Sequence, residues 1–87
     1  MKSKKQLFKD LEEIDPVYFK GVDLDHDKIS NETYGRDSRI YIEFESNKSR
    51  LEVERKLKSK GHVIKAYGMG NVCEVRVSFF RGWHWDE

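Results

Sequence analysis

The sequence predicts a single small α+β domain of 87 residues, and three observations support this prediction. Apolar residues recur at helical spacing in residues 3–15 and 47–60. They alternate with polar residues, as in strands, in residues 39–45 and 72–80. Charged residues make up 38% of the chain, but they carry both signs and stand beside 13% aromatic residues, which favours a folded domain over a disordered chain. We expect an N-terminal helix followed by strand, helix, strand and strand, in a three-stranded mixed sheet with both helices on one face.

The first helix is expected to begin at Ser3 and to end before Pro16. Ser3 followed three residues later by Gln6 is a capping-box pattern, and the residue before a proline disfavours the helical conformation. Residues 17–19 are apolar and indicate either a brief strand or a hydrophobic tether against the core. Residues 23–38 are polar and follow neither period, so we expect a long loop there.

The sheet is expected to form in the second half of the chain. Residues 39–45 alternate as a strand with one buried face, and the helix over 47–60 ends at Gly61, which readily adopts the left-handed terminating conformation. A strand over 62–67, a tight turn and a strand over 72–80 then form a hairpin. A right-handed crossover would set the first two strands parallel, which makes the predicted sheet mixed.

The cysteine content and the hydropathy pattern indicate the cellular compartment in which the protein is expected. The chain has one cysteine, Cys73, and therefore forms no internal disulfide. No apolar run follows the N-terminal lysines as in a signal peptide, and none approaches the ~20 residues that a membrane span needs. We expect a cytoplasmic protein with no membrane partner.

Three carboxylates near residue 25 have the spacing of calcium ligands. Asp23, Asp25 and Asp27 match the first, third and fifth positions of a calcium loop. Lys28 stands where that loop needs a glycine, and Tyr34 stands where it needs a bidentate carboxylate. We therefore interpret the segment as a plain acidic loop.

The four candidate zinc ligands, Cys73, His26, His62 and His84, include no pair at the short spacing that zinc sites show. Cys73 falls on the expected core face of the last strand, where a small buried hydrophobe is the preferred interpretation. The sequence shows no serine elbow, no phosphate-cradling glycine loop and no convincing catalytic pair of carboxylates. We expect no metal, no cofactor and no enzymatic activity.

Charge is divided unevenly along the chain, because residues 1–45 carry a net charge of −3 and residues 46–87 carry +4. Most acidic residues therefore lie in the first half of the chain, and the excess of basic over acidic residues lies in the second half. The second half of the chain is thus expected to present a positive face to phosphates or to an acidic protein.

The second predicted helix concentrates this charge in a stripe. At 100° per residue, Lys48, Arg55 and Lys58 share one side with Leu51, which offers an apolar anchor among phosphate or carboxylate contacts. The alternative is an ordinary solvated face. Pairs four residues apart, from Glu52 to Lys56 and from Glu54 to Lys58, would then stabilise the helix.

Aromatic residues gather at the end of the chain, which reads RGWHWDE. One interpretation is that these rings close the core of a small domain. The other is a contact patch, because tryptophan and arginine are enriched among interface anchors. The patch would consist of Phe80, Arg81, Trp83 and Trp85.

The sheet face away from the helices is a third candidate surface. Tyr41, Tyr67 and Arg76 are expected there, and aromatic, partly basic sheet faces stack single-stranded RNA in several small modules. Glu43 and Glu74 share that face and would repel phosphate, and pairs between glutamate and arginine also stabilise ordinary exposed sheets.

The sequence therefore predicts a binding protein. The leading prediction is a protein-interaction module or inhibitor, with contacts at Phe80, Arg81, Trp83, Trp85 and Leu51. The size is also that of many phage or mobile-element proteins that block a host factor. The alternative is a nucleic-acid-binding protein that uses Lys48, Arg55, Lys58, Tyr41, Tyr67 and Arg76. An unpaired sheet edge also offers a route to a homodimer.

Overall fold

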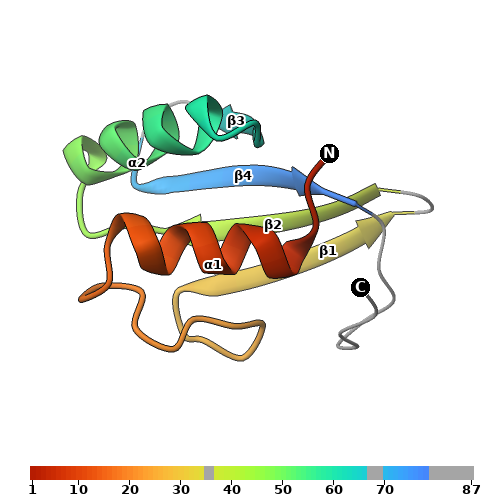
Figure 1. The fold of residues 1–87 in the computed structure, drawn as a ribbon, viewed down its shortest axis with the longest axis horizontal. Helices are drawn as coiled ribbons and strands as arrows, with labels where there is room; N and C mark the ends of the chain where they lie inside the picture. The colour runs from red at the N-terminus through yellow and green to blue at the C-terminus, as the bar shows by residue number, and fades with distance from the viewer. Residues whose placement is uncertain (35–36, 67–69, 79–87) are drawn as a thin grey trace.

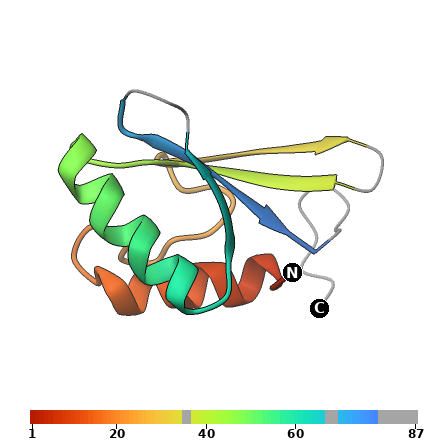
Figure 2. The ribbon, with the colours of Figure 1, turned by 90° about the horizontal axis from the view of Figure 1, so that it is seen from above.

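The computed structural model describes residues 1–34, 37–66 and 70–78 and has two layers (Figure 1). The helix layer contains α1 (Lys4–Ile14) and α2 (Asn47–Ser59). The sheet layer contains β1 (Ile29–Tyr34), β2 (Asp37–Glu43), β3 (Val63–Ala66) and β4 (Val72–Val77). Figure 2 shows both helices on the same side of the sheet. The predicted α+β class and the placement of both helices on one face are confirmed.

Two details of the predicted sheet are wrong, its number of strands and its mixed pairing. The sheet has four strands in the order β1-β2-β4-β3, and every neighbouring pair is antiparallel. β4 lies between β2 and β3, so those two strands run in the same direction without pairing. β4 suits the central position because Glu74 is 3% exposed on one face while Val75 is fully buried on the other. β3 suits an edge, with only four residues and Val63 46% exposed.

The additional strand, β1, falls in the segment that we expected to be a loop. Its residues Ser30, Asn31 and Glu32 are polar, so the sequence shows no alternation that would reveal a strand. Pairing with β2 nevertheless places Ile29 opposite Ile42, and both side chains join the core. β1 and β3 form the two edges of the sheet. A homodimer through one of these edges stays a prediction.

The helix ends follow the sequence signals. The Ser3 side chain accepts a hydrogen bond from the Gln6 backbone N–H at 3.1 Å, and α1 ends at Ile14. The apolar segment after Pro16 forms turns and acts as the tether, with Phe19 fully buried and packed edge-to-face on Phe44 at a centroid distance of 5.9 Å. Among the described residues, neither helix combines the length and apolar character that crossing a membrane requires.

The hydrophobic core lies between the two layers. α1 and α2 each bury an apolar stripe against the inner face of the sheet, as the helical spacing predicted. The fully buried members of this core are Leu7, Leu11, Phe19, Ile40, Ile42, Leu57, Cys73, Val75 and Val77. The inner faces of β2 and β4 therefore hold the helices in fixed positions, and this fixes which helix surfaces face solvent.

Candidate functional site

Helix α2 is fixed at both ends and along one side. At its start, the Ser46 hydroxyl accepts a hydrogen bond from the Ser49 backbone N–H at 3.1 Å. At its end, Gly61 adopts a positive φ of 94°, as the sequence predicted. Val53 and Leu57 are buried against the sheet. The opposite side of α2 is thereby presented to solvent in one defined orientation.

A buried ion pair strengthens this attachment. Arg50 and Glu54 are 4% and 5% exposed, and Arg50 Nη1 donates to Glu54 Oε2 at 2.6 Å. Arg50 Nε also donates to the Gly70 carbonyl at 2.7 Å, which links α2 to the segment before β4. Because Glu54 turns inward to Arg50, the expected pair with Lys58 does not form in the described part of the chain.

The solvent side of α2 carries the predicted basic stripe. We define the α2 face as Lys48, Leu51, Arg55 and Lys58, all of which are exposed. Leu51 is 53% exposed, a large value for a leucine on a packed helix. Within residues 1–34, 37–66 and 70–78, none of the three basic side chains forms an ion pair. All four residues are thus accessible on α2, and their role in binding stays a prediction.

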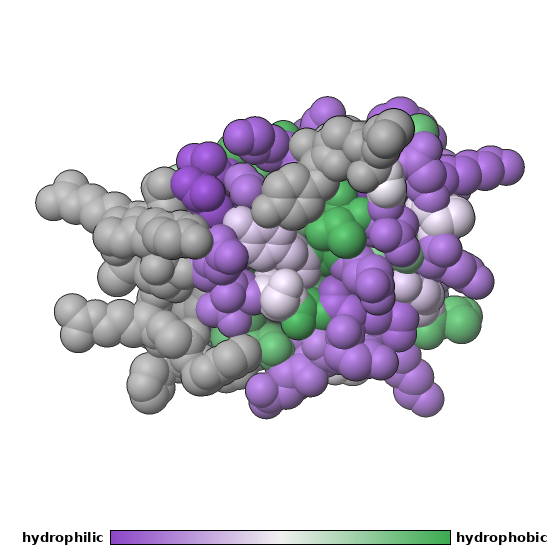
Figure 3. Space-filling view, turned by 180° about the vertical axis from the view of Figure 1, so that it is seen from behind, coloured by the Kyte–Doolittle hydropathy of each residue, from purple (hydrophilic) through white to green (hydrophobic). Residues whose placement is uncertain are grey.

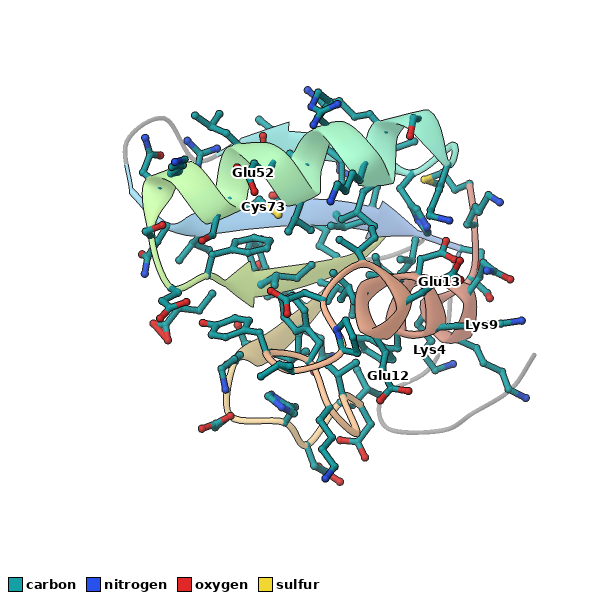
Figure 4. The ribbon with its side chains drawn as sticks, turned by 60° about the vertical axis from the view of Figure 1, so that its left-hand side comes forward. Lys4, Lys9, Glu12, Glu13, Glu52 and Cys73 are labelled. Atoms are coloured by element: carbon teal, nitrogen blue, oxygen red, sulfur yellow. The ribbon has the colours of Figure 1, made fainter. Side chains whose placement is uncertain are left out.

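The α2 face combines an apolar contact point with unpaired positive charge. Burying the exposed part of Leu51 against a partner would contribute on the order of 1 kcal/mol. The exposed charged residues of α2 are four basic ones against the single acid Glu52, which Figure 4 labels on this helix. This surface favours carboxylates or phosphates as partners, and salt will weaken the attraction.

The second predicted set of basic and aromatic residues lies on the other layer. Tyr41 is 8% exposed on the sheet face away from the helices, and its hydroxyl donates to Glu32 Oε2 at 2.9 Å. Arg76 Nε donates to Glu74 Oε2 at 3.2 Å on the same face. The ring of Tyr41 is therefore largely covered, and neither side chain joins the α2 face in one site.

A hollow on this sheet face was not predicted from the sequence. We define the outer groove as two adjoining hollows that share Ser30, Tyr41 and Val72. One hollow encloses about 190 Å³ and is lined by Asp27, Lys28, Ile29, Ser30, Tyr41, Glu43 and Val72. The adjoining hollow encloses about 260 Å³ and adds Glu32. Figure 3 views this side of the molecule, where pale and green residues lie among purple hydrophilic ones. The groove was missed because it depends on β1, which the sequence did not reveal.

The candidate zinc ligands do not come together in the described residues. Cys73 is fully buried on β4 beneath α2 (Figure 4), and burial, followed by the nearby Glu54 carboxylate, raises the pKa of its thiol to about 12. His62 is buried elsewhere, with Nε2 2.6 Å from Asp10 Oδ2. In the described ranges, no three histidine, cysteine, aspartate or glutamate side chains are placed to hold a metal ion.

Several predicted site residues lie outside the described residues. They are Tyr67, the candidate zinc ligand His84 and the C-terminal contact residues Phe80, Arg81, Trp83 and Trp85. Their role in binding therefore stays a prediction from the sequence.

Comparison of the chain with protein-family models, with curated proteins and with solved structures finds no match.

Proposed function

We propose that this protein is a non-enzymatic protein-interaction module that uses the α2 face to bind an acidic surface of a protein partner. The observation that supports this most directly is the exposure of Leu51, 53%, among three basic side chains that form no ion pair in the described structure. An exposed apolar side chain can fill a pocket of a partner, while the charged side chains around it form the polar rim of the interface.

The attachment of α2 favours this role. Ser46 at one end, Gly61 at the other and the Arg50–Glu54 pair underneath hold the helix before any partner arrives. Binding then orders only the side chains of the α2 face and does not need to order its backbone. A rigid helix face of this kind suits a module or inhibitor whose binding depends on a fixed arrangement of contacts.

The C-terminal residues extend the proposal. Phe80, Arg81, Trp83 and Trp85 are of the residue types that dominate interface energetics, and we propose that they add contacts to the same partner. We also propose that the protein acts in the cytoplasm, which its free and buried thiol at Cys73 supports.

Affinity capture from the lysate of its own cells, with and without nuclease, tests this function. The wild-type chain should retain a protein band that survives nuclease, and Leu51→Asp should lose that band. Val17→Asp is the matched control, because Val17 is also an exposed apolar residue, at 89%, and lies outside the α2 face. Capture that is equal for both variants would contradict the proposal, and Trp85→Ala tests the C-terminal contribution separately.

Nucleic acid is the second candidate ligand, and the spacing of the basic residues favours it. Lys48, Arg55 and Lys58 extend over about 15 Å of helix, a length comparable to several phosphates of one strand. In this alternative, the captured material would disappear with nuclease. Affinity for an oligonucleotide should then fall steeply with salt and decrease in Lys58→Glu, whereas a flat salt response would exclude this candidate.

A further inference from the structure

The outer groove has an apolar floor and an acidic rim. Tyr41 forms part of the floor at 8% exposure, together with the half-buried Val72, whereas the Ile29 side chain belongs to the core on the other face of the sheet. Asp27, Glu43 and Glu32 supply carboxylates around this floor. A ligand for the groove should therefore combine an apolar projection with positive charge.

One described base lines the groove, and it does not cancel this acidity. Lys28 Nζ lies 3.6 Å from Asp27 Oδ1 and 4.6 Å from the centroid of the Tyr18 ring. Two carboxylates, those of Glu32 and Glu43, are left without a lysine or arginine among the residues that line the groove. Arg39 lies directly opposite Glu32 in the pairing of β1 with β2, and Arg76 lies opposite Arg39 in the pairing of β2 with β4, but neither arginine is among the residues that line the groove.

The α2 face has the complementary features on the other layer of the molecule. Leu51 is the apolar projection, and Lys48, Arg55 and Lys58 surround it with positive charge. The α2 face extends over about 15 Å along the helix, and the strands β1, β2 and β4 that carry the groove span about 10 Å between their outer axes. Charge and hydropathy therefore match between two surfaces of the same chain.

From this complementarity we infer that the α2 face of one copy docks into the outer groove of a second copy. Leu51 then contacts the floor at Tyr41 and Val72, while the basic side chains approach Glu32 and Glu43. The two surfaces are different patches on opposite layers, so the contact is heterologous and each copy keeps one free surface of each kind at the ends. The assembly is an open head-to-tail chain and not a closed dimer.

The contact should be weak and sensitive to salt. Patches of this length bury less area than stable interfaces, which commonly bury more than ~1,200 Å². Sedimentation velocity of the full chain at low salt is therefore expected to show an average mass that rises with concentration and passes that of a dimer. At high salt the same samples should return to the monomer mass. A wild-type chain that stays monomeric at every concentration in low salt would overturn the inference.

Two variants, each blocked on one surface, distinguish this arrangement from symmetric self-association. Leu51→Asp removes the apolar projection and places a carboxylate opposite an acidic groove, and Glu43→Lys places a cation opposite a basic helix. Each variant alone is expected to be monomeric. An equimolar mixture should form a dimer that does not grow further, because each variant still offers the surface that the other lacks.

Matched controls separate the contact from general charge effects. Val17→Asp and Asp25→Lys make the same kinds of change at exposed positions outside both surfaces, and both variants should associate like the wild type. Unchanged melting temperatures would show that the blocked variants are folded. A mixture that stays monomeric, or single variants that still associate, would overturn the head-to-tail arrangement.

This inference shares the α2 face with the proposed function but needs no foreign partner. Self-association that fails while Leu51→Asp still abolishes capture would reject only the inference. Self-association that succeeds while capture is unaffected would reject only the proposed function.

Discussion

Arg50 and Glu54 form an ion pair with an Nη1–Oε2 distance of 2.6 Å beneath α2, although the other charged residues of that helix face solvent. The pair is nearly inaccessible, and Arg50 makes two further contacts, to Asn47 Oδ1 and to the Gly70 carbonyl. It connects α2 to the segment before β4 and at the same time withdraws Glu54 from the surface. The positive character of the α2 face therefore depends on a contact made underneath it.

Removing one member of this pair should destabilise the fold strongly. Arg50→Met leaves the Glu54 carboxylate buried without its partner, which typically costs about 3–5 kcal/mol. Arg55→Met, an exposed site on the same helix, is the control and should change the free energy of unfolding by no more than about 0.5 kcal/mol. Urea denaturation measures both variants. Equal midpoints for the two would show that the buried pair does not secure α2.

The two leucines of α2 should respond very differently to truncation. Leu57 is fully buried, so Leu57→Ala should lower the free energy of unfolding by about 2–5 kcal/mol through lost burial and a cavity. Leu51 is 53% exposed, so Leu51→Ala should cost less than about 1 kcal/mol while it weakens partner capture. Denaturant midpoints and capture yields check both parts. A large loss of stability in Leu51→Ala would assign this side chain to the core.

The buried contact between Asp10 and His62 should make stability depend on acidic pH. Desolvation by burial acts to raise the pKa of Asp10, but hydrogen bonds from His62 and Gln6 outweigh it and hold the pKa below its ordinary value of 3.8. A lowered folded-state pKa contributes stability above the unfolded-state pKa. This contribution is lost as the pH falls through the folded-state pKa.

Wild-type protein should therefore lose more stability than Asp10→Asn between neutral pH and about pH 3. Comparing the two chains cancels the carboxylates that they share, and urea midpoints along the pH series provide the measurement. Glu13→Gln, at an exposed carboxylate that pairs with Lys60 Nζ at 3.7 Å, is the control and should follow the wild type closely. Parallel curves for the wild type and Asp10→Asn would contradict the assigned role of Asp10.

The thiol of Cys73 should be unreactive in the folded protein. Burial raises its pKa to about 12, so the thiolate fraction at mildly alkaline pH is very small, and the side chain is fully inaccessible. A thiol-specific reagent should label the native protein slowly and the urea-unfolded protein at once. Fast labelling without denaturant would show that β4 or α2 opens readily.

Local signals in the sequence were enough for the helices and for the inner face of the sheet. Ser3, Ser46 and Gly61 mark helix ends through bonds to neighbouring residues, and the alternation around Ile42 reflects burial on one side of a strand. The stripe of Lys48, Leu51, Arg55 and Lys58 follows from helical geometry alone. These features could be predicted because each depends on residues close together in the chain.

Only the tertiary structure decided which strands pair and which charged side chains are buried or face solvent. β1 is polar and gains its strand conformation by pairing with β2, and β4 enters between β2 and β3 through contacts that no local pattern encodes. Glu54 has favourable partners four residues away in both directions, Arg50 and Lys58, and burial selects Arg50 because Lys58 faces water. The sequence by itself determined which residues form helices and which helix face is basic. The long-range packing decided where the outer groove lies, because a groove exists only where strands from distant segments meet.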